Sequence, residues 1–116
     1  MRVWDLPPEM LCRNHLLGEH SELHGIWTIL TQGRQGGYAN HPEVLRWKGK
    51  LRALFLKHEE IVDEMARRGY RHNSPLDAEL ATGADQQDTL VDSYEDQVKI
   101  LRRKGCDCRI PRSNQD

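Results

Sequence analysis

The sequence predicts an all-α fold, organised as a compact single domain of about three main helices with the N-terminal segment inserted between them. Three observations support this prediction. The length of 116 residues suits one domain with a modest core. Apolar residues recur at helical spacing in three long stretches, and no stretch alternates apolar and polar residues as a strand does. We expect residues 1–105 to form the domain and residues 106–116 to be a flexible tail.

The first helix is predicted to follow the prolines at positions 7 and 8 and to end at Gln32. Its apolar stripe, which faces the core, comprises Cys12, Leu16, His20, Leu23, Trp27 and Leu30. Gly18 and Gly25 lie beside a second stripe. Because a glycine inside a helix costs roughly 1 kcal/mol relative to alanine, we expect another backbone, that of the N-terminal segment, to pass close to them.

The second helix is predicted to span Pro42 to Arg68, with Asn40 or His41 as its cap. The glycine-rich loop before it, residues 33–37, offers free backbone N–H groups beside Arg34 and is a candidate phosphate contact. The residues expected to face inward from this helix are Val44, Leu45, Trp47, Leu51, Leu54, Phe55, His58, Ile61, Val62 and Met65.

The third helix is predicted to run from about Asp85 to Lys104, where Gly105 ends it. Before it, a short helical turn is expected between Ser74 and Leu80. The residues that this helix should bury are Leu90, Val91, Tyr94, Val98 and Leu101.

Charge is segregated along the chain although its sum is only −1. Between residues 32 and 58 the single acid Glu43 stands against Arg34, Arg46, Lys48, Lys50, Arg52 and Lys57. A basic surface of this kind suits an anionic polymer, and a solvated helix face of mixed charge explains the same pattern equally well.

The sequence also limits the setting in which the protein works. Its three cysteines form an odd number, no hydrophobic leader precedes them, and no apolar run is long enough to cross a membrane. These features predict reduced thiols in a cytoplasmic protein without membrane contact. We expect a monomer.

His15, Glu19 and Glu22 share the second stripe of the first helix, and three interpretations compete for them. The first is a solvated or salt-bridged face. The second is a metal site, because the neighbouring His20 and His24 are spaced as zinc ligands often are, although no HExxH or CxxC pattern accompanies them. The third is a carboxylate beside an amine nucleophile. A free α-amino group, with a pKa near ~8, is partly neutral at physiological pH, whereas a lysine with a pKa of ~10.4 is not.

Short motifs in a fixed order resemble a known family. They are MRVW at residues 1–4, HLLGE at 15–19, SEL at 21–23, GYANHP at 37–42 and RRGY at 67–70. Together they resemble the pyrimidine-dimer DNA glycosylases, the small endonuclease V-type enzymes whose prototype comes from a phage. The resemblance covers roughly residues 1 to 75.

The resemblance implies an α-amine nucleophile at Met1 and a partner acid at Glu22. It also implies that Arg2 and His15 contact DNA, and it places Asn40 and His41 in a motif of the shorter bacterial relatives. Arginines that the prototype carries next to its catalytic glutamate are replaced here by serine and glycine. We expect their phosphate contacts to come instead from Arg34, Arg46, Lys50 or His24.

The expected function is therefore that of a DNA repair glycosylase and abasic-site lyase acting on damaged double-stranded DNA. It would excise cyclobutane pyrimidine dimers through a Schiff base on the N-terminal amine and nick the strand by β-elimination, with no cofactor and no metal ligand. The alternatives are a non-catalytic DNA-binding helical domain and a metal-binding helical bundle.

Overall fold

The computed structural model describes residues 2–105 and Cys108. Within this part the chain is all-α and contains no strand, which confirms the predicted fold class. Its four α-helices are α1 (Arg13–Gln32), α2 (Pro42–Leu45), α3 (Leu51–Arg67) and α4 (Tyr94–Arg103). The described part also has three short 3-10 helices: η1 (Pro8–Met10) before α1, η2 (Gly37–Asn40) between α1 and α2, and η3 (Ala78–Leu80) between α3 and α4. None of the described helices is both long and apolar enough to cross a bilayer. The rest of the predicted tail, residues 106–107 and 109–116, lies outside the described residues.

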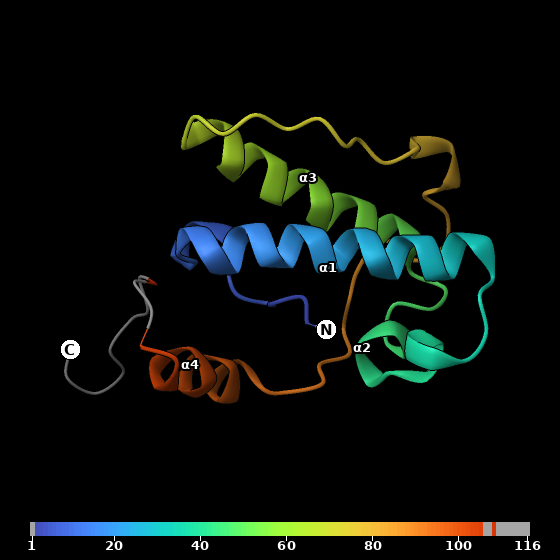
Figure 1. Ribbon diagram of the computed structural model, residues 1–116. Coiled ribbons are helices and arrows are strands. Elements are labelled where there is room, and N and C mark those ends of the chain that lie inside the picture. Colours follow the sequence, from blue (N-terminus) through green and yellow to red (C-terminus); the bar gives the residue numbers. More distant parts are fainter. Residues whose placement is uncertain (1, 106–107, 109–116) are drawn as a thin grey trace.

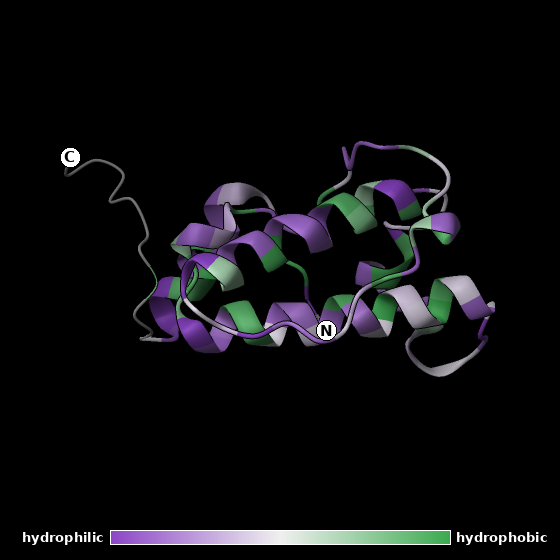
Figure 2. Cartoon of the chain, turned by 90° about the horizontal axis from the view of Figure 1, so that it is seen from above, coloured by the Kyte–Doolittle hydropathy of each residue, from purple (hydrophilic) through white to green (hydrophobic). Residues whose placement is uncertain are grey.

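The core lies between α1 and α3, which run side by side (Figure 1). Figure 2 shows hydrophobic and hydrophilic residues alternating along the helices, as expected when each helix buries one face. The apolar residues with no exposed surface are Leu16, Leu23, Ile26, Val44, Leu54, Ile61 and Leu101. Most of them were predicted to face inward, whereas Leu45, also predicted to be buried, is 44 % exposed.

The first helix begins later than predicted. The prolines start only the short turn η1, and Leu11 then adopts an extended backbone, so α1 begins at Arg13. The predicted end at Gln32 is correct. Gly33 follows in the left-handed conformation (φ 62°), which favours glycine and closes the helix.

The prediction of one continuous helix over residues 42–68 is wrong, because the chain turns between α2 and α3. Gly49 takes a positive φ of 75° in this turn. The first N–H groups of a helix have no acceptor within it, and here the N–H of Arg52 donates to the carbonyl of Thr82 (2.8 Å). A Cβ atom at Gly83 would collide with the Gly49 carbonyl oxygen, so only glycine allows this approach. A segment distant in sequence therefore caps α3.

The third main helix, α4, is shorter than predicted. It begins at Tyr94 rather than at Asp85, because the side chain of Ser93 accepts a hydrogen bond from a backbone N–H of its first turn. Leu101 is buried as predicted. Val91 and Tyr94 are 44 % and 56 % exposed, so the prediction that they are buried is wrong.

The N-terminal segment is inserted between the helices, as predicted. Figure 1 shows it running between α1 and α4. The backbone N–H of Asp5 donates to Gln97 Oε1 on α4 (2.8 Å), and Lys57 Nζ on α3 donates to the Leu6 carbonyl (3.3 Å). Hydrogen bonds from two helices thus hold a segment that has no secondary structure of its own.

The close backbone approach predicted at Gly18 is absent. A Cβ atom added there would meet no atom within 4 Å, so the space beside it is open. The N-terminal segment instead contacts α1 one residue further on, where the N–H of Trp4 donates to the carboxylate of Glu19. Gly18 leaves room on this face of α1 and does not serve as a packing contact.

Candidate functional site

An open cleft of about 440 Å³ lies where the N-terminal segment crosses α1. The residues that line it are Arg2, Trp4, Asn14, His15, Gly18, Glu19, Glu22, His41 and Lys104. His15, Glu19 and Glu22, predicted to share one face of the first helix, therefore lie together in the structure. Their spacing of three and four residues places them on successive turns of α1.

Arg2 and Trp4 form the wall opposite α1. Arg2 Nη1 donates to Asp92 Oδ2 at 2.7 Å, and the guanidinium lies 5.0 Å from the centroid of the Trp4 ring. The side chains of Arg2 and Asp92 are 33 % and 31 % exposed, so solvent or a ligand can reach them. Met1, the predicted nucleophile, lies outside the described residues.

Glu19 holds this wall in place. It is 2 % exposed, and one of its carboxylate oxygens accepts the N–H of Trp4. Its other oxygen, Oε1, is buried with no hydrogen-bond partner in the described part of the chain. Burial raises the pKa of Glu19 to about 8, against the opposing effects of Lys57 and of the Trp4 bond. Much of Glu19 is therefore protonated at neutral pH, unlike an ordinary surface glutamate. The sequence pattern could not separate Glu19 from Glu22, because both lie on the same stripe.

Two histidines from different elements face the same cleft. His41 Nδ1 accepts the backbone N–H of Glu43 (3.0 Å), so His41 is the predicted cap of α2 and its Nε2 carries the proton of the neutral ring. His15 lies edge-on to the Trp4 ring. Burial, followed by the charge of Lys104, lowers the pKa of His15. Both imidazoles therefore line the cleft as polar groups able to hydrogen-bond a ligand.

A second hollow, of about 490 Å³, adjoins the glycine-rich loop after α1. Its polar lining includes Arg34, Asn40 and Lys48. Arg34 is exposed, and its Nε donates to Gln32 Oε1 (3.0 Å). The predicted residues Arg34 and Asn40 thus share one surface, and Lys48 adds a second cation that the prediction did not include.

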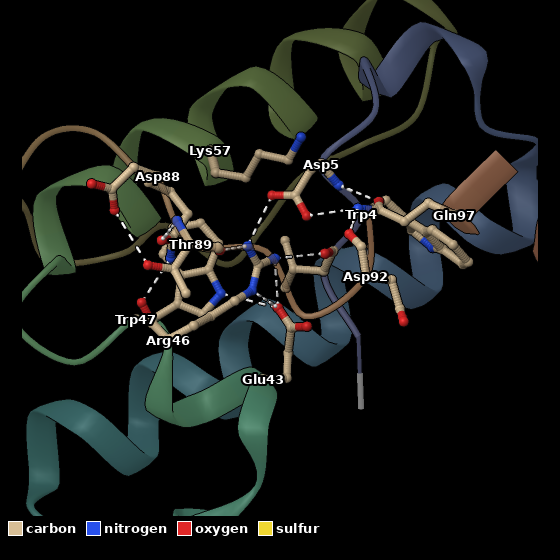
Figure 3. A network of polar contacts seen from close by, with 12 residues as sticks. Trp4, Asp5, Glu43, Arg46, Trp47, Lys57, Asp88, Thr89, Asp92 and Gln97 are labelled. Carbon is tan, nitrogen blue, oxygen red and sulfur yellow. Dashed lines mark hydrogen bonds and ion pairs between the residues drawn. The ribbon is translucent and has the colours of Figure 1, made fainter. Parts of the chain in front are cut away.

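Arg46, a predicted phosphate contact, lies in the interior (Figure 3). Its side chain is 2 % exposed and is paired with Asp5 Oδ1 (2.9 Å) and Glu43 Oε1 (2.7 Å). It also donates to the carbonyl oxygens of Val3 (2.9 Å) and Thr89 (2.8 Å). Contact with DNA would require these bonds to break, so Arg46 is a structural residue that joins α2 to the N-terminal segment.

Lys50, also predicted to contact phosphate, is held by the segment before α4. Its ammonium group donates to Gln87 Oε1 (2.7 Å), Asp88 Oδ1 (3.0 Å) and Thr89 Oγ1 (3.1 Å). Three acceptors already satisfy its three donors. Like Arg46, Lys50 stabilises the fold rather than presenting a free charge.

His24 lies away from the cleft, in one of two clusters of groups able to ligate a metal. The first cluster consists of His20, His24, His58 and His72, and the second of Cys12, His15 and Cys108. The spacing of His20 and His24 is visible in the sequence, whereas His58 and His72 come from other elements and no sequence pattern links them to that pair. The sequence feature that hints at this cluster is the number of histidines, because the cluster contains four of the six histidines in the chain.

Comparison with known proteins identifies the part of the chain that carries the cleft. A family model described as pyrimidine dimer DNA glycosylase matches residues 1–78. The match includes the N-terminal segment and α1 to α3, and so every cleft residue except Lys104. No curated protein and no solved structure matches the chain.

Proposed function

The chain belongs to the pyrimidine dimer DNA glycosylase family, and from this premise we propose that it excises cyclobutane-dimer pyrimidines from ultraviolet-damaged double-stranded DNA in the cleft beside Glu22. The observation that supports the proposal most directly is that Arg2, His15 and Glu22 line this one cleft. A carboxylate, an arginine and an imidazole beside an open space suit a cationic sugar intermediate flanked by phosphates.

The proposed nucleophile is the α-amine of Met1, in a mature chain that begins at that residue. Met1 directly precedes Arg2 in the sequence, and Arg2 lines the cleft. With a pKa near ~8, an α-amine has a useful neutral fraction at physiological pH. That fraction can attack carbon without a separate base.

The proposed reaction proceeds in two stages. The amine attacks C1′ of the damaged nucleotide, and the N-glycosidic bond breaks with its electron pair leaving on the base, which takes up a proton. The amine nitrogen loses a proton and its lone pair forms a C=N bond to C1′, while the C1′–O4′ bond breaks with its electron pair on O4′, which is protonated. The product is an imine between Met1 and the opened sugar. Glu22, as carboxylate, stabilises the positive charge at C1′. It then removes a proton from C2′, and the electrons of that bond expel the 3′ phosphate by β-elimination.

DNA contacts are proposed for two adjoining surfaces. Arg2, His15 and His41 would hold the displaced nucleotide in the cleft, while Arg34 and Asn40, with Lys48, would contact phosphates at the second hollow. Displacing a nucleotide costs a few kcal/mol of stacking, which is lowest at a damaged site. Arg46, Lys50 and His24 are not part of these surfaces because they are engaged with other parts of the protein.

Borohydride trapping tests the chemistry. The wild-type chain should form a covalent complex with an abasic-site or dimer-containing duplex, and acetylation of its N-terminal amine should prevent it. Glu22→Gln should slow base release by on the order of 10²–10⁴-fold while leaving DNA affinity nearly unchanged. Glu79→Gln, which alters an exposed glutamate outside the cleft, is the matched control and should behave as wild type.

Three outcomes would contradict the proposal. Trapping that survives N-terminal acetylation would assign the nucleophile to another amine. Loss of DNA affinity in Glu22→Gln would assign Glu22 to binding. Salt-dependent DNA binding without any trapping would favour the alternative of a non-catalytic DNA-binding domain.

A further inference from the structure

Four histidine side chains meet between α1, α3 and the segment that follows α3. His20 and His24 lie one turn apart on α1, His58 projects from α3, and His72 follows that helix. One ring nitrogen of each lies within 4.8 Å of those of the other three. The Nε2 atom of His24 is 3.2 Å from Nε2 of both His20 and His58. Nitrogens from three separate segments of the chain therefore converge on one point.

Hydrogen bonds between neutral rings account for this arrangement only in part. His58 Nδ1 lies 3.0 Å from the carboxylate of Glu59, which accepts when ionised, so Nδ1 carries the ring proton and Nε2 presents a lone pair. The Nε2 of His24 would then have to donate, and its single N–H would be shared between the Nε2 atoms of His58 and His20. In addition, Nε2 of His72 is buried with no hydrogen-bond partner in the described part of the chain. A shared cation satisfies all four nitrogens at once.

The spacing of the nitrogens fits a metal ion. A metal about 2.0–2.1 Å from each nitrogen of a tetrahedron requires about 3.3–3.4 Å between neighbouring nitrogens. The two His24 contacts, at 3.2 Å, are close to this length. Small rotations of the remaining rings would shorten the longer nitrogen–nitrogen distances in the cluster. Four imidazoles without a carboxylate among them suit zinc, copper or nickel rather than magnesium or calcium.

The four rings are buried or partly buried, and a carboxylate contacts one of them. Burial, together with the neighbouring histidines, lowers the pKa of His20 to about 4, and burial also lowers the pKa of His24 and of His58. The carboxylate of Glu59 on His58 Nδ1 is the kind of contact that orients a ligating histidine.

We propose that His20, His24, His58 and His72 bind one divalent transition-metal ion, with zinc as the expected occupant. Four protein ligands leave no open position, which indicates a structural role. His20 and His24 lie two positions before and after Glu22, and at 3.6 residues per turn two positions point to opposite sides of a helix. The ion would thus fasten α1 to α3 from the side opposite the cleft. This proposal does not depend on the proposed enzymatic activity.

Metal counting tests the proposal without any activity assay. The full chain, purified without a histidine tag, is loaded with zinc chloride, dialysed, and analysed for zinc by mass spectrometry. The wild type should carry one equivalent more than His72→Ala or His24→Gln, whose zinc affinity should fall by more than about tenfold. His41→Gln, which removes a histidine outside the cluster, is the matched control and should retain the wild-type content.

A second measurement separates this site from the cluster of Cys12, His15 and Cys108. In zinc-loaded Cys12→Ser protein, X-ray absorption should show nitrogen at about 2.0–2.1 Å and no sulfur at about 2.3 Å. Chelation should lower the melting temperature of this variant, and added zinc should restore it. Should a histidine variant fail to fold, these data still decide the question. A sulfur shell, no bound zinc in Cys12→Ser, or equal zinc in wild type and folded His72→Ala would overturn the proposal.

Discussion

The buried network around Arg46 and the open cleft beside Glu22 use the same kinds of side chain for opposite purposes. In the network, the guanidinium of Arg46 is enclosed between the carboxylates of Asp5 and Glu43. In the cleft, Arg2 pairs with Asp92 at a rim where both side chains are about a third exposed. Because the Arg46 guanidinium is fully paired with buried acceptors, it fixes the N-terminal segment. Because the Arg2 guanidinium is only partly enclosed, its charge stays available to a ligand.

Removing the buried arginine should have the largest effect on stability. Arg46→Met leaves the carboxylates of Asp5 and Glu43 without their cation, and breaking a buried ion pair in this way costs about 3–5 kcal/mol. Chemical denaturation of the full chain measures the change in the free energy of unfolding. Arg34→Met, at an exposed position, is the control and should stay within ~0.5 kcal/mol of wild type. Equal losses in the two variants would contradict a structural role for Arg46.

Glu19 connects the two regions, and a pair of substitutions shows what it contributes. Glu19→Ala leaves the buried N–H of Trp4 without an acceptor and should cost about 1–3 kcal/mol of unfolding free energy. Glu19→Gln keeps an acceptor oxygen and resembles the protonated acid that a pKa of about 8 favours at neutral pH, so its cost should be under ~1 kcal/mol.

Denaturation at neutral pH compares the two variants. The same loss in both would mean that the negative charge of Glu19 matters more than its hydrogen bond. Base release should follow stability, falling in Glu19→Ala because the wall that carries Arg2 is then loosened, and remaining near wild type in Glu19→Gln.

Substitutions at Arg2 test whether the charge in the open cleft is available to DNA. Arg2→Gln should weaken duplex DNA binding and reduce the slope of log affinity against log salt by about 1. Unfolding free energy should change by only ~0–1 kcal/mol, because a partly exposed ion pair contributes little. Asp92→Asn breaks the same pair but retains the cation, so its DNA affinity should equal or exceed that of wild type. A matching loss in Asp92→Asn would show that the pair itself, and not the free charge, is what DNA binding requires.

The smallest effect is expected at Glu64, which pairs with two exposed or partly exposed arginines near the end of α3. Burial acts to raise the pKa of Glu64, but hydrogen bonds and charge from Arg68 and Arg67 outweigh it and lower the pKa below 4.5. A lowered folded pKa gives stability that is present above the unfolded pKa and is lost as pH falls through the folded value.

Glu64→Gln should therefore cost at most ~1 kcal/mol near neutral pH, and its difference from wild type should shrink below pH 4.5. Unfolding curves collected across this pH range measure the trend. Glu60→Gln, at an exposed pair with a 3.9 Å separation, should differ from wild type by no more than a few tenths of a kcal/mol at any pH. A Glu64→Gln difference that grows in acid would contradict the assigned direction.

By itself, the sequence determined the helical class, the inward face of α1 and the grouping of His15, Glu19 and Glu22. These follow from the spacing of residues along one helix, which is a local property. The short motifs also identified the family, since their order is written in the chain.

Only the tertiary structure decided which charges are buried and which ligands meet. Arg46 and Arg34 look alike in a basic stretch. Yet Arg46 is paired with the distant Asp5 as well as with the nearby Glu43, whereas Arg34 lies in solvent. The break at Gly49 depends on a segment near Gly83, and the histidine cluster depends on α3 and His72 packing against α1. Such contacts join residues far apart in the chain, and no periodic pattern encodes them, because they arise only when the helices pack.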